Sequence, residues 1–211
     1  MHRILILACS AATLMFVTAG CFGGAKPGPE AAIEKFNTAV AHKDEVLAKD
    51  YADLGPVTQS GADYVWTALS PSLESALVAE AGLSRGEAQT LIRESLRAKE
   101  KLLVDVLSEL AAEKPLLASD VRFRPRKTEV HEERAYVRAE LEGDSAADFE
   151  ITLRKAGDGW RIVKLSPEFW GRLWPQSSIQ SHAPGPDKVL TAYGVERKQE
   201  PDSAPAGADT P

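Results

Sequence analysis

The sequence predicts an α+β domain in which N-terminal helices pack on an antiparallel sheet. Apolar residues recur at helical spacing from residue 30 to about residue 113, and then with a period of two from residue 120 to residue 165. A period of two is typical of an antiparallel sheet that buries one face and wets the other. Helices that precede a run of strands, instead of alternating with them, favour the α+β class.

The N-terminus has the pattern of an export signal. Arg3 gives a short positive end, residues 4–19 form an almost unbroken apolar stretch, and small residues follow. Val17-Thr18-Ala19-Gly20-Cys21 resembles the lipobox read by lipoprotein signal peptidase, with threonine where an aliphatic residue is more common. Only a thiolate forms the thioether to diacylglycerol, so we expect a signal peptide at 1–20 and lipidation at Cys21. An uncleaved transmembrane helix would need roughly 20 apolar residues, more than this stretch supplies.

Residues 21–29 then read as a lipidated, flexible tether, since glycine and proline dominate after Phe22. Acyl chains hold a protein to a bilayer through their buried methylenes. An aspartate directly after the lipidated cysteine resembles an inner-membrane retention signal. Residue 22 is a phenylalanine instead, and this favours the outer membrane over the inner. We therefore expect a protein anchored in the bacterial cell envelope and facing the periplasm.

Composition narrows the classes of function. The chain has two cysteines, and neither Cys9 in the signal nor the lipidated Cys21 leaves a thiol for a disulfide or a metal. The full chain has a formal net charge of −6. Its first 20 residues hold one arginine and no acid, so the mature charge is about −7. This charge argues against nucleic acid as a partner and against a broad electrostatic landing on anionic lipid.

The first helices can be placed from their caps. Residues 29–43 are predicted as a helix that opens on Pro29, with Ile33 and Phe36 on its apolar face. Asp44 then caps a shorter helix that runs to Tyr51. Leu54-Gly55-Pro56 is predicted to end it, and residues 57–69 fit either a strand or a helix.

A helical hairpin is predicted at 70–113. Ser70-Pro71 opens its first helix and Gly82 ends it as a left-handed cap. Ser84 and Glu87 have the spacing of a capping box, which starts a long helix over 85–112. The apolar stripe of this helix is Ile92, Leu96, Leu103, Leu107 and Leu110.

Strands are predicted over 120–165, with a tight turn at 156–159. Their inward residues include Val121, Phe123 and Pro125; Val137, Ala139 and Leu141; Phe149, Ile151 and Leu153; and Trp160 and Ile162. Large apolar residues continue to 195, so a single domain over 30–195 is expected. Residues 196–211 contain no large apolar residue beyond Glu196 and are predicted to be a disordered tail.

This pattern resembles the nuclear transport factor 2-like (cystatin-like) superfamily, and within it small bacterial lipoproteins of unknown function. The matching segments are Ala32-Ile33-Glu34-Lys35-Phe36-Asn37-Thr38-Ala39-Val40, Lys43-Asp44 and the strand pair over 149–165, which ends in Gly159-Trp160-Arg161-Ile162-Val163. The resemblance implies a curved sheet that wraps the first helix around a cone-shaped apolar pocket. The hairpin at 70–113 departs from it and is expected to be an insertion.

Catalysis in that superfamily uses an aspartate or histidine with a tyrosine inside the cone, which would make this chain an isomerase or hydratase. The acidic and tyrosine residues in the region that could line the pocket match no catalytic spacing: Asp44, Asp50, Tyr51, Asp53, Asp63 and Tyr64. The histidines, His42, His131 and His182, lack a second ligand at metal spacing. We therefore expect no enzyme activity, no metal and no cofactor.

Two groups of residues are candidates for binding. Arg122, Arg124 and Arg126 form the basic run of one strand, either a solvated face or a site for an acidic partner or a lipid headgroup. Trp170 and Trp174 lie one helical turn apart, and either complete the core or form an exposed patch.

The expected function is that of a non-enzymatic envelope lipoprotein that binds a partner protein or an apolar small molecule. The isomerase or hydratase is the first alternative. The second is a structural accessory subunit of an envelope complex that uses the long helix at 85–112 as its interface. A pocket with an inward carboxylate would favour the enzyme, and a filled cone with an exposed apolar stripe on the long helix would favour the interaction protein.

Overall fold

The computed structural model describes residues 27–118 and 121–198, and for residues 144–147 the backbone alone. It confirms the α+β class, because helices precede a four-stranded antiparallel sheet of order β1-β2-β3-β4. The elements are α1 (Pro29–Ala41), α2 (Glu45–Tyr51), α3 (Leu54–Ala81), α4 (Arg85–Glu94), α5 (Leu96–Glu113), β1 (Phe123–His131), β2 (Arg134–Leu141), β3 (Asp144–Ala156), β4 (Gly159–Leu165), α6 (Pro167–Leu173), α7 (Gln176–Ser181) and α8 (Pro186–Tyr193).

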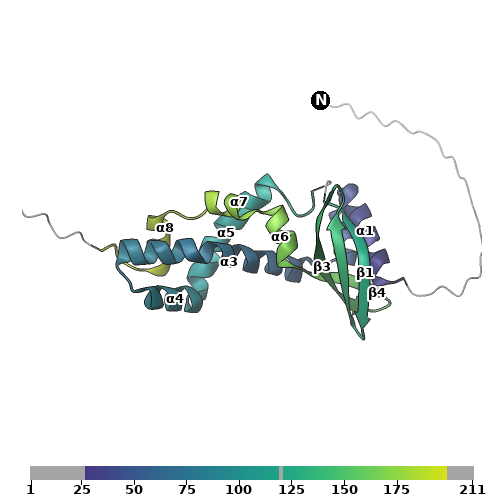
Figure 1. The fold of residues 1–211 in the computed structure, drawn as a ribbon, viewed down its shortest axis with the longest axis horizontal. Helices are drawn as coiled ribbons and strands as arrows, with labels where there is room; N and C mark the ends of the chain where they lie inside the picture. The colour runs from purple at the N-terminus through teal and green to yellow at the C-terminus, as the bar shows by residue number, and fades with distance from the viewer. Residues whose placement is uncertain (1–26, 119–120, 199–211) are drawn as a thin grey trace, which may run out of the picture.

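The molecule is elongated and has two ends (Figure 1). We call the sheet with α1 and α2 the sheet end, and the C-terminal half of α3 with α4, α5, α7 and α8 the helical arm. Helix α3 runs from one to the other, and α6 lies where they meet (Figure 1). The described chain begins at the sheet end and finishes at the far end of the arm, where the Lys198 amide donates to the Glu80 carbonyl.

The first two helices form as their caps predict. Pro29 occupies the first position of α1, where no intrahelical partner for its nitrogen exists. The buried face of α1 includes Ile33 and Phe36. The Asp44 carboxylate accepts from the Leu47 amide at 2.9 Å and opens α2.

Helix α3 corrects the prediction of a break at 54–56 and of a helix start at Ser70-Pro71. Pro56 lies in the first turn of α3, where backbone amides have no partner to lose. Pro71 lies inside the helix and is exposed. The buried stripe of α3 continues on both sides of it, so burial outweighs the roughly 3 kcal/mol that an interior proline costs. That stripe is Val57, Val65, Leu69, Leu73 and Leu77.

The long helix predicted at 85–112 is two helices. The Ser84–Glu87 capping box is present and Gly82 is left-handed at φ 69°, as predicted. The chain leaves helical geometry at Ser95, with φ −87° and ψ 81°. This bend turns α5 so that Ala98 and Leu102 face the core. Leu96, which was predicted in the buried stripe, is instead 70% exposed.

The four predicted strands are all present. Val137, Ala139, Phe149, Ile151 and Leu153 are buried as the alternation requires. Trp160 is only partly buried, because it lies at the end of the sheet. The turn at 156–159 is a tight one, with Gly157 in the left-handed region at φ 60°. Bulges interrupt each pairing, and the first lies between Pro125 and Lys127.

The segment after the sheet folds into three short helices that close the arm. Ser72 on α3 donates to the side chain of Gln180 on α7 at 2.5 Å. The first residues of the predicted tail, 196–198, pack beside α3: Arg197 contacts Glu80 at 3.3 Å and Asp187 at 2.8 Å. Residues 199–211 lie outside the described part of the chain.

Candidate functional site

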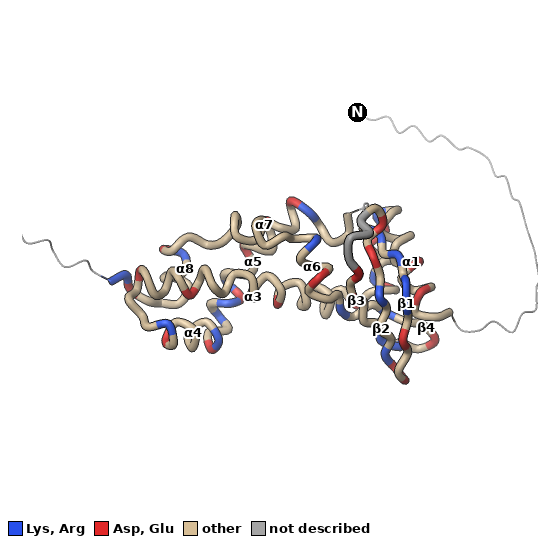
Figure 2. The backbone as a smooth tube through the Cα atoms, viewed as in Figure 1, with Lys and Arg blue, Asp and Glu red and all other residues tan. Residues whose placement is uncertain are grey.

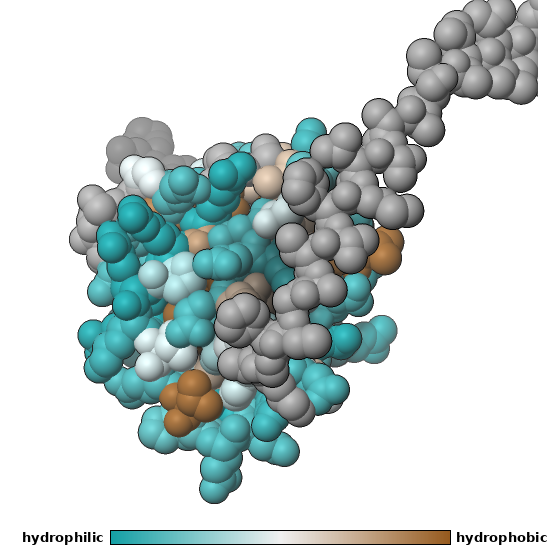
Figure 3. All heavy atoms as spheres, turned by 90° about the vertical axis from the view of Figure 1, so that its right-hand side faces the viewer, coloured by the Kyte–Doolittle hydropathy of each residue, from teal (hydrophilic) through white to brown (hydrophobic). Residues whose placement is uncertain are grey.

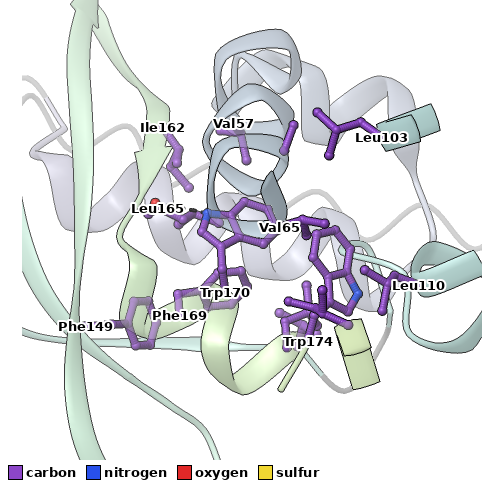
Figure 4. Close-up of a cluster of buried hydrophobic side chains, with 14 of the residues drawn as sticks. Val57, Val65, Leu103, Leu110, Phe149, Ile162, Leu165, Phe169, Trp170 and Trp174 are labelled. Atoms are coloured by element: carbon purple, nitrogen blue, oxygen red, sulfur yellow. Dashed lines mark hydrogen bonds between the residues drawn. The ribbon is translucent and has the colours of Figure 1, made fainter. Parts of the chain in front are cut away.

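The space between the sheet and α1 is filled by aromatic side chains. Phe36 of α1 stacks on Phe123 with ring centroids 5.8 Å apart. Phe169 of α6 meets Phe123 at 5.5 Å and Phe149 at 5.3 Å. These four residues are at most 3% exposed, and Figure 4 shows Phe149 and Phe169 side by side in the cluster. The chain's own rings therefore fill the region where the resemblance implied a pocket.

The two candidate tryptophans complete the core, the first of the two alternatives that their spacing allowed, and do not form an exposed binding patch. Trp170 is 1% exposed and Trp174 7%, and their rings stack at 5.1 Å. The indole nitrogen of Trp170 donates to the Ser60 hydroxyl at 3.0 Å. It also donates to the carbonyl of Leu165, the residue next to it in Figure 4, at 3.1 Å. The indole nitrogen of Trp174 donates to the Lys114 carbonyl at 3.0 Å. Because α6 is wedged against α3, both faces of these rings are covered.

The candidate acidic residues lie outside the aromatic cluster. Asp44 is a helix cap, and Asp53 lies 3.6 Å from Arg154. Asp63 pairs with Lys99 at 3.3 Å on the surface of α3. Among the side chains that the structure describes, Glu140 is the one buried charged residue, and it lies under arginines of β1.

The histidines are likewise structural in position. His182, at the end of α7, has both ring nitrogens 2.8 Å from carboxylates of α5, those of Glu109 and Glu113. His131 lies against Tyr136 with ring centroids 6.0 Å apart. Over residues 27–118 and 121–198, no group of three or more acidic, histidine or cysteine side chains has the geometry to hold a metal ion.

An apolar groove runs along the free edge of β4. Its walls are the N-terminal half of α3, including Ser60 and Tyr64, and the end of β4 at Val163 and Leu165. The groove holds about 590 Å³ and its lining is mainly apolar. Tyr64 rests against Gly171, and burial raises the pKa of its hydroxyl. Exposed Gln59 and Thr67 form the rim, so the groove is open to a ligand.

The predicted basic run is neutralised within the sheet. Arg126 lies 2.5 Å and Arg124 3.7 Å from Glu140, and Arg122 lies 3.6 Å from Glu142. Glu140 is 7% exposed beneath the two arginines. Glu140 stands on the neighbouring strand β2, where the register sets it opposite Arg124, and Glu142 directly follows the end of that strand. The three arginines therefore form a cross-strand ion-pair cluster and offer little free positive charge.

A second set of cations gathers on the outer face of the sheet, the face opposite α1. Arg134 is directly opposite Arg154 of β3, which is opposite Arg161 of β4. Arg138 lies further along β2, and Lys164 further along β4. We call the exposed Arg134, Arg138, Arg161 and Lys164 the outer quartet. Within the described residues none of the four forms an ion pair, whereas Arg154 pairs with Asp53.

The sequence contained a signal for the outer quartet in the alternation of the strands. Arg138 and Arg161 stand at outward positions of β2 and β4. They are distant in the sequence, however, and only the strand register brings them together. Arg122, Arg124 and Arg126 were easier to recognise in the sequence because they are close together. Their ion pairs make them less available to bind an anionic ligand.

Charges of both signs are spread over the whole molecule (Figure 2). The exposed apolar side chains at the sheet end include Val46 and Val130, at 77% and 53%. Where described residues are visible in the end-on view of Figure 3, most of the surface is hydrophilic and apolar side chains stand apart. No broad apolar patch is visible on that face.

Residues 1–20 and Cys21 lie outside the described residues. Within the described ranges, no helix combines the length and the apolarity that crossing a bilayer requires. Comparison with protein-family models, with curated proteins and with solved structures gives no match for this chain.

Proposed function

We propose that this chain is a lipid-anchored protein of the bacterial cell envelope, facing the periplasm, which works by binding rather than by catalysis. Its ligand would be an extended segment of a partner protein, held in the groove between α3 and β4. The observation that carries this proposal is the open, mainly apolar groove of about 590 Å³ at the sheet edge, beside a cone filled by the chain's own rings.

The edge of β4 is suited to a further strand. It pairs with β3 on one side only, and on the other side the chain itself adds a short parallel bridge between Ala52 and Ile162. The Asp53 amide donates to the Ile162 carbonyl at 2.8 Å in this bridge. The groove lies beside Val163 and Leu165, between this part of β4 and α3. An extended peptide could continue the pairing there, with side chains in the groove for specificity.

An apolar small molecule is the second candidate. The groove volume lies within the roughly 300–1,000 Å³ of small-molecule sites. Ser60 and Tyr64 supply polar groups in a mainly apolar lining. Native mass spectrometry of the purified full chain would reveal such a molecule as added mass, and Tyr64→Ala should reduce its occupancy.

We also propose that the fold is a cystatin-like, nuclear transport factor 2-like variant. In support, α1 packs across the inner face of an antiparallel sheet whose strands follow in sequence order. The helices between residues 54 and 113 are then an insertion that carries the arm. In this variant the aromatic side chains and α6 fill the space that would otherwise be a ligand pocket, and α6 connects the inserted helices to the sheet.

Photo-crosslinking in the producing cell tests the groove. A photoreactive amino acid at Gln59 or Thr67, on the rim, should yield a defined adduct with one partner. The same residue at Thr90, exposed on α4, is the matched control and should not. Val163→Glu places a charge on the apolar wall and should abolish the adduct while the thermal melt stays close to wild type. Equal adducts from Thr90, or an adduct that survives Val163→Glu, would refute the proposal.

The anchor is tested separately. Cys21→Ala should remove metabolic labelling by palmitate and block signal cleavage, because the thiolate is the acceptor of the lipid. A Cys9→Ala variant removes the other cysteine and should be labelled and processed normally. Labelling that persists in Cys21→Ala would show that the anchor is elsewhere.

A further inference from the structure

The outer face of the sheet is rich in cations although the chain as a whole is acidic. The chain has a formal net charge of −6. The acidic residues of this face are Glu129, Glu140, Asp148 and Glu150. Lys127 holds Glu129 at 2.8 Å, and Arg126 holds Glu140 at 2.5 Å. Glu150 stands directly opposite Arg138, and Asp148 lines the same hollow as Arg138. Arg134, Arg161 and Lys164 face no carboxylate across the described strands, so the four cations of the outer quartet outnumber these two acids and leave the face net positive.

The register makes the outer quartet a compact patch. Residues directly opposite each other on neighbouring strands have Cβ atoms about 5 Å apart, so the row Arg134, Arg154, Arg161 spans about 10 Å. Arg138 lies four residues along β2 from Arg134, or about 14 Å. The row Tyr136, Thr152, Lys164 lies between them. Like charges placed directly opposite destabilise a sheet, so an anionic ligand on this patch would relieve that repulsion.

The position of Pro27, the first described residue, indicates which surface lies near the outer quartet. Pro27 and Arg161 line the same small hollow beside the β3–β4 turn. Pro27 is six positions after Cys21, and an extended chain covers about 20 Å over that distance. If Cys21 carries the lipid, the edge of the sheet next to Arg161 is held within that distance of the bilayer surface.

We propose that the outer quartet docks this face of the sheet on anionic phospholipid headgroups of the membrane that holds the anchor. The proposal rests on the proposed lipidation of Cys21. Arginine is suited to the task, since its planar guanidinium can bind two oxygens of one phosphate. Tyr136 adds an amphipathic ring of the kind that is enriched at membrane interfaces. The contact is electrostatic, and salt weakens it.

Docking would fix the orientation of the molecule. A lipid tether alone lets the domain turn freely, whereas contact through the outer quartet sets the sheet against the bilayer. The partner groove shares Lys164 and Pro167 with a polar hollow on the outer face, so it would open next to the membrane surface. A partner segment that lies close to the bilayer would then meet the groove.

Energy transfer on vesicles tests the proposal with the full chain. A fluorescent amino acid at Thr152, in the centre of the patch, reports its distance from acceptor dyes on lipid headgroups. Transfer should be stronger on phosphatidylcholine vesicles that contain phosphatidylglycerol than on phosphatidylcholine alone. The same fluorophore at exposed Thr191, on α8 of the arm, should show no such difference.

The matched variants change equal numbers of charges. Arg134→Gln, Arg138→Gln, Arg161→Gln and Lys164→Gln together should lower the ratio of docked to undocked protein by nearly three orders of magnitude, because each cation near an anionic surface favours contact by about fivefold. The control set is Arg93→Gln, Arg97→Gln, Lys101→Gln and Lys114→Gln, all exposed in the arm or at its base, and it should leave the transfer unchanged. All eight positions are on the surface, so circular dichroism should match wild type.

The experiment distinguishes failure of the docking proposal from failure of the proposed lipidation of Cys21. A chain without the lipid should leave zwitterionic vesicles and still dock on anionic ones through the quartet. Transfer from Thr152 that is independent of anionic lipid, or equal in the two variants, would overturn the proposal. If Arg134→Gln, Arg138→Gln and Arg161→Gln together, which leave Lys164 of the groove unchanged, keep the lipid-dependent transfer but lose the crosslinked partner, the face binds an acidic protein instead.

Discussion

The sheet end and the helical arm are held together by different forces. In the sheet end, Phe36, Phe123 and Phe149 meet ring to ring, and the strands bury a continuous apolar face. In the arm, α3 and α5 supply apolar stripes, but the last helices are also fixed by surface ion pairs. Lys188 contacts Asp105 at 2.6 Å, and His182 is clamped by two glutamates of α5.

This difference predicts where the molecule opens first. Burial of apolar area is not weakened by charge screening, whereas an exposed ion pair contributes about 0–1 kcal/mol and weakens in salt. The closing segments of the arm should therefore exchange their amide hydrogens before the strands do. Helix α6 joins the two regions, because its rings belong to the aromatic cluster and to the interface with α3.

The largest expected effect comes from breaking the joint. Phe169→Ala removes a fully buried ring that contacts Phe123, Phe149 and Trp170, and should cost about 3–5 kcal/mol of unfolding free energy. Hydrogen exchange should accelerate in β3 and in α3 together. Leu110→Ala, a deletion of a fully buried side chain in the arm, is the control and should spare the strands. If Phe169→Ala also spared them, α6 would not couple the two regions.

A smaller effect is expected from the close contact of α3 with α6. A Cβ at Gly61 would lie 2.9 Å from the indole ring of Trp170, so Gly61→Ala should destabilise by about 1–3 kcal/mol. Gly86→Ala in α4 meets nothing within 4 Å and should not destabilise, since alanine is the better helix former. Urea unfolding of both variants measures the contrast. A stabilised Gly61→Ala would mean that Trp170 can move aside freely.

The cap at the start of α4 should contribute less to the free energy of unfolding than the contacts of α6, and its loss should affect α4 alone. Ser84→Ala removes the cap that accepts from the Glu87 amide and should cost about 1 kcal/mol. Faster exchange should be confined to α4, with the strands unchanged. Ser108→Ala, whose hydroxyl bonds only to its own helix at Val104, is the control and should have little effect.

The smallest expected effect depends on pH. The hydrogen bond to Glu113, and behind it the charges of Glu113 and Glu109, raise the pKa of His182 above its ordinary value despite an opposing effect of desolvation. Its contribution to stability is therefore complete below about pH 6.5, the unfolded value, and is lost as the pH rises through the higher folded value. Protection factors in α7, which remove the pH dependence of intrinsic exchange, should fall over that range in wild type but not in His182→Gln. Protection factors that do not change with pH in wild type would contradict a stabilising contact of His182 with the two glutamates.

Local chemistry explains which parts of the fold were predictable. Pro29, Asp44 and the Ser84–Glu87 pair act within one turn of chain, so the sequence predicts the helix starts that they set. The period of two also predicts the strands, because one face is buried throughout. The prediction that a helix starts at Pro71 was wrong because contacts remote in the sequence decide the structure there. The local preference of Pro71 is overridden by contacts of Leu69 and Leu73 with residues remote in the sequence.

The candidate sites were harder to predict, since each depends on a partner element. The basic run of β1 is neutralised by Glu140 and Glu142, which only the register of β2 brings near. Trp170 is covered because Gly61 allows α3 to approach it closely. Neither contact leaves a mark in the local sequence. The groove at β4 is likewise made by α3, a helix whose start was predicted elsewhere.

Helix α3 is long enough to reach from the groove to the far end of the arm. Its N-terminal half forms one wall of the groove, and its last turn holds the end of the described chain through Glu80. A helix of 28 residues is about 42 Å long, so a tilt of about 5° at the groove displaces the far end by about 4 Å. One continuous helix therefore connects the groove to the tip of the arm, and a small tilt at the groove would be amplified along it.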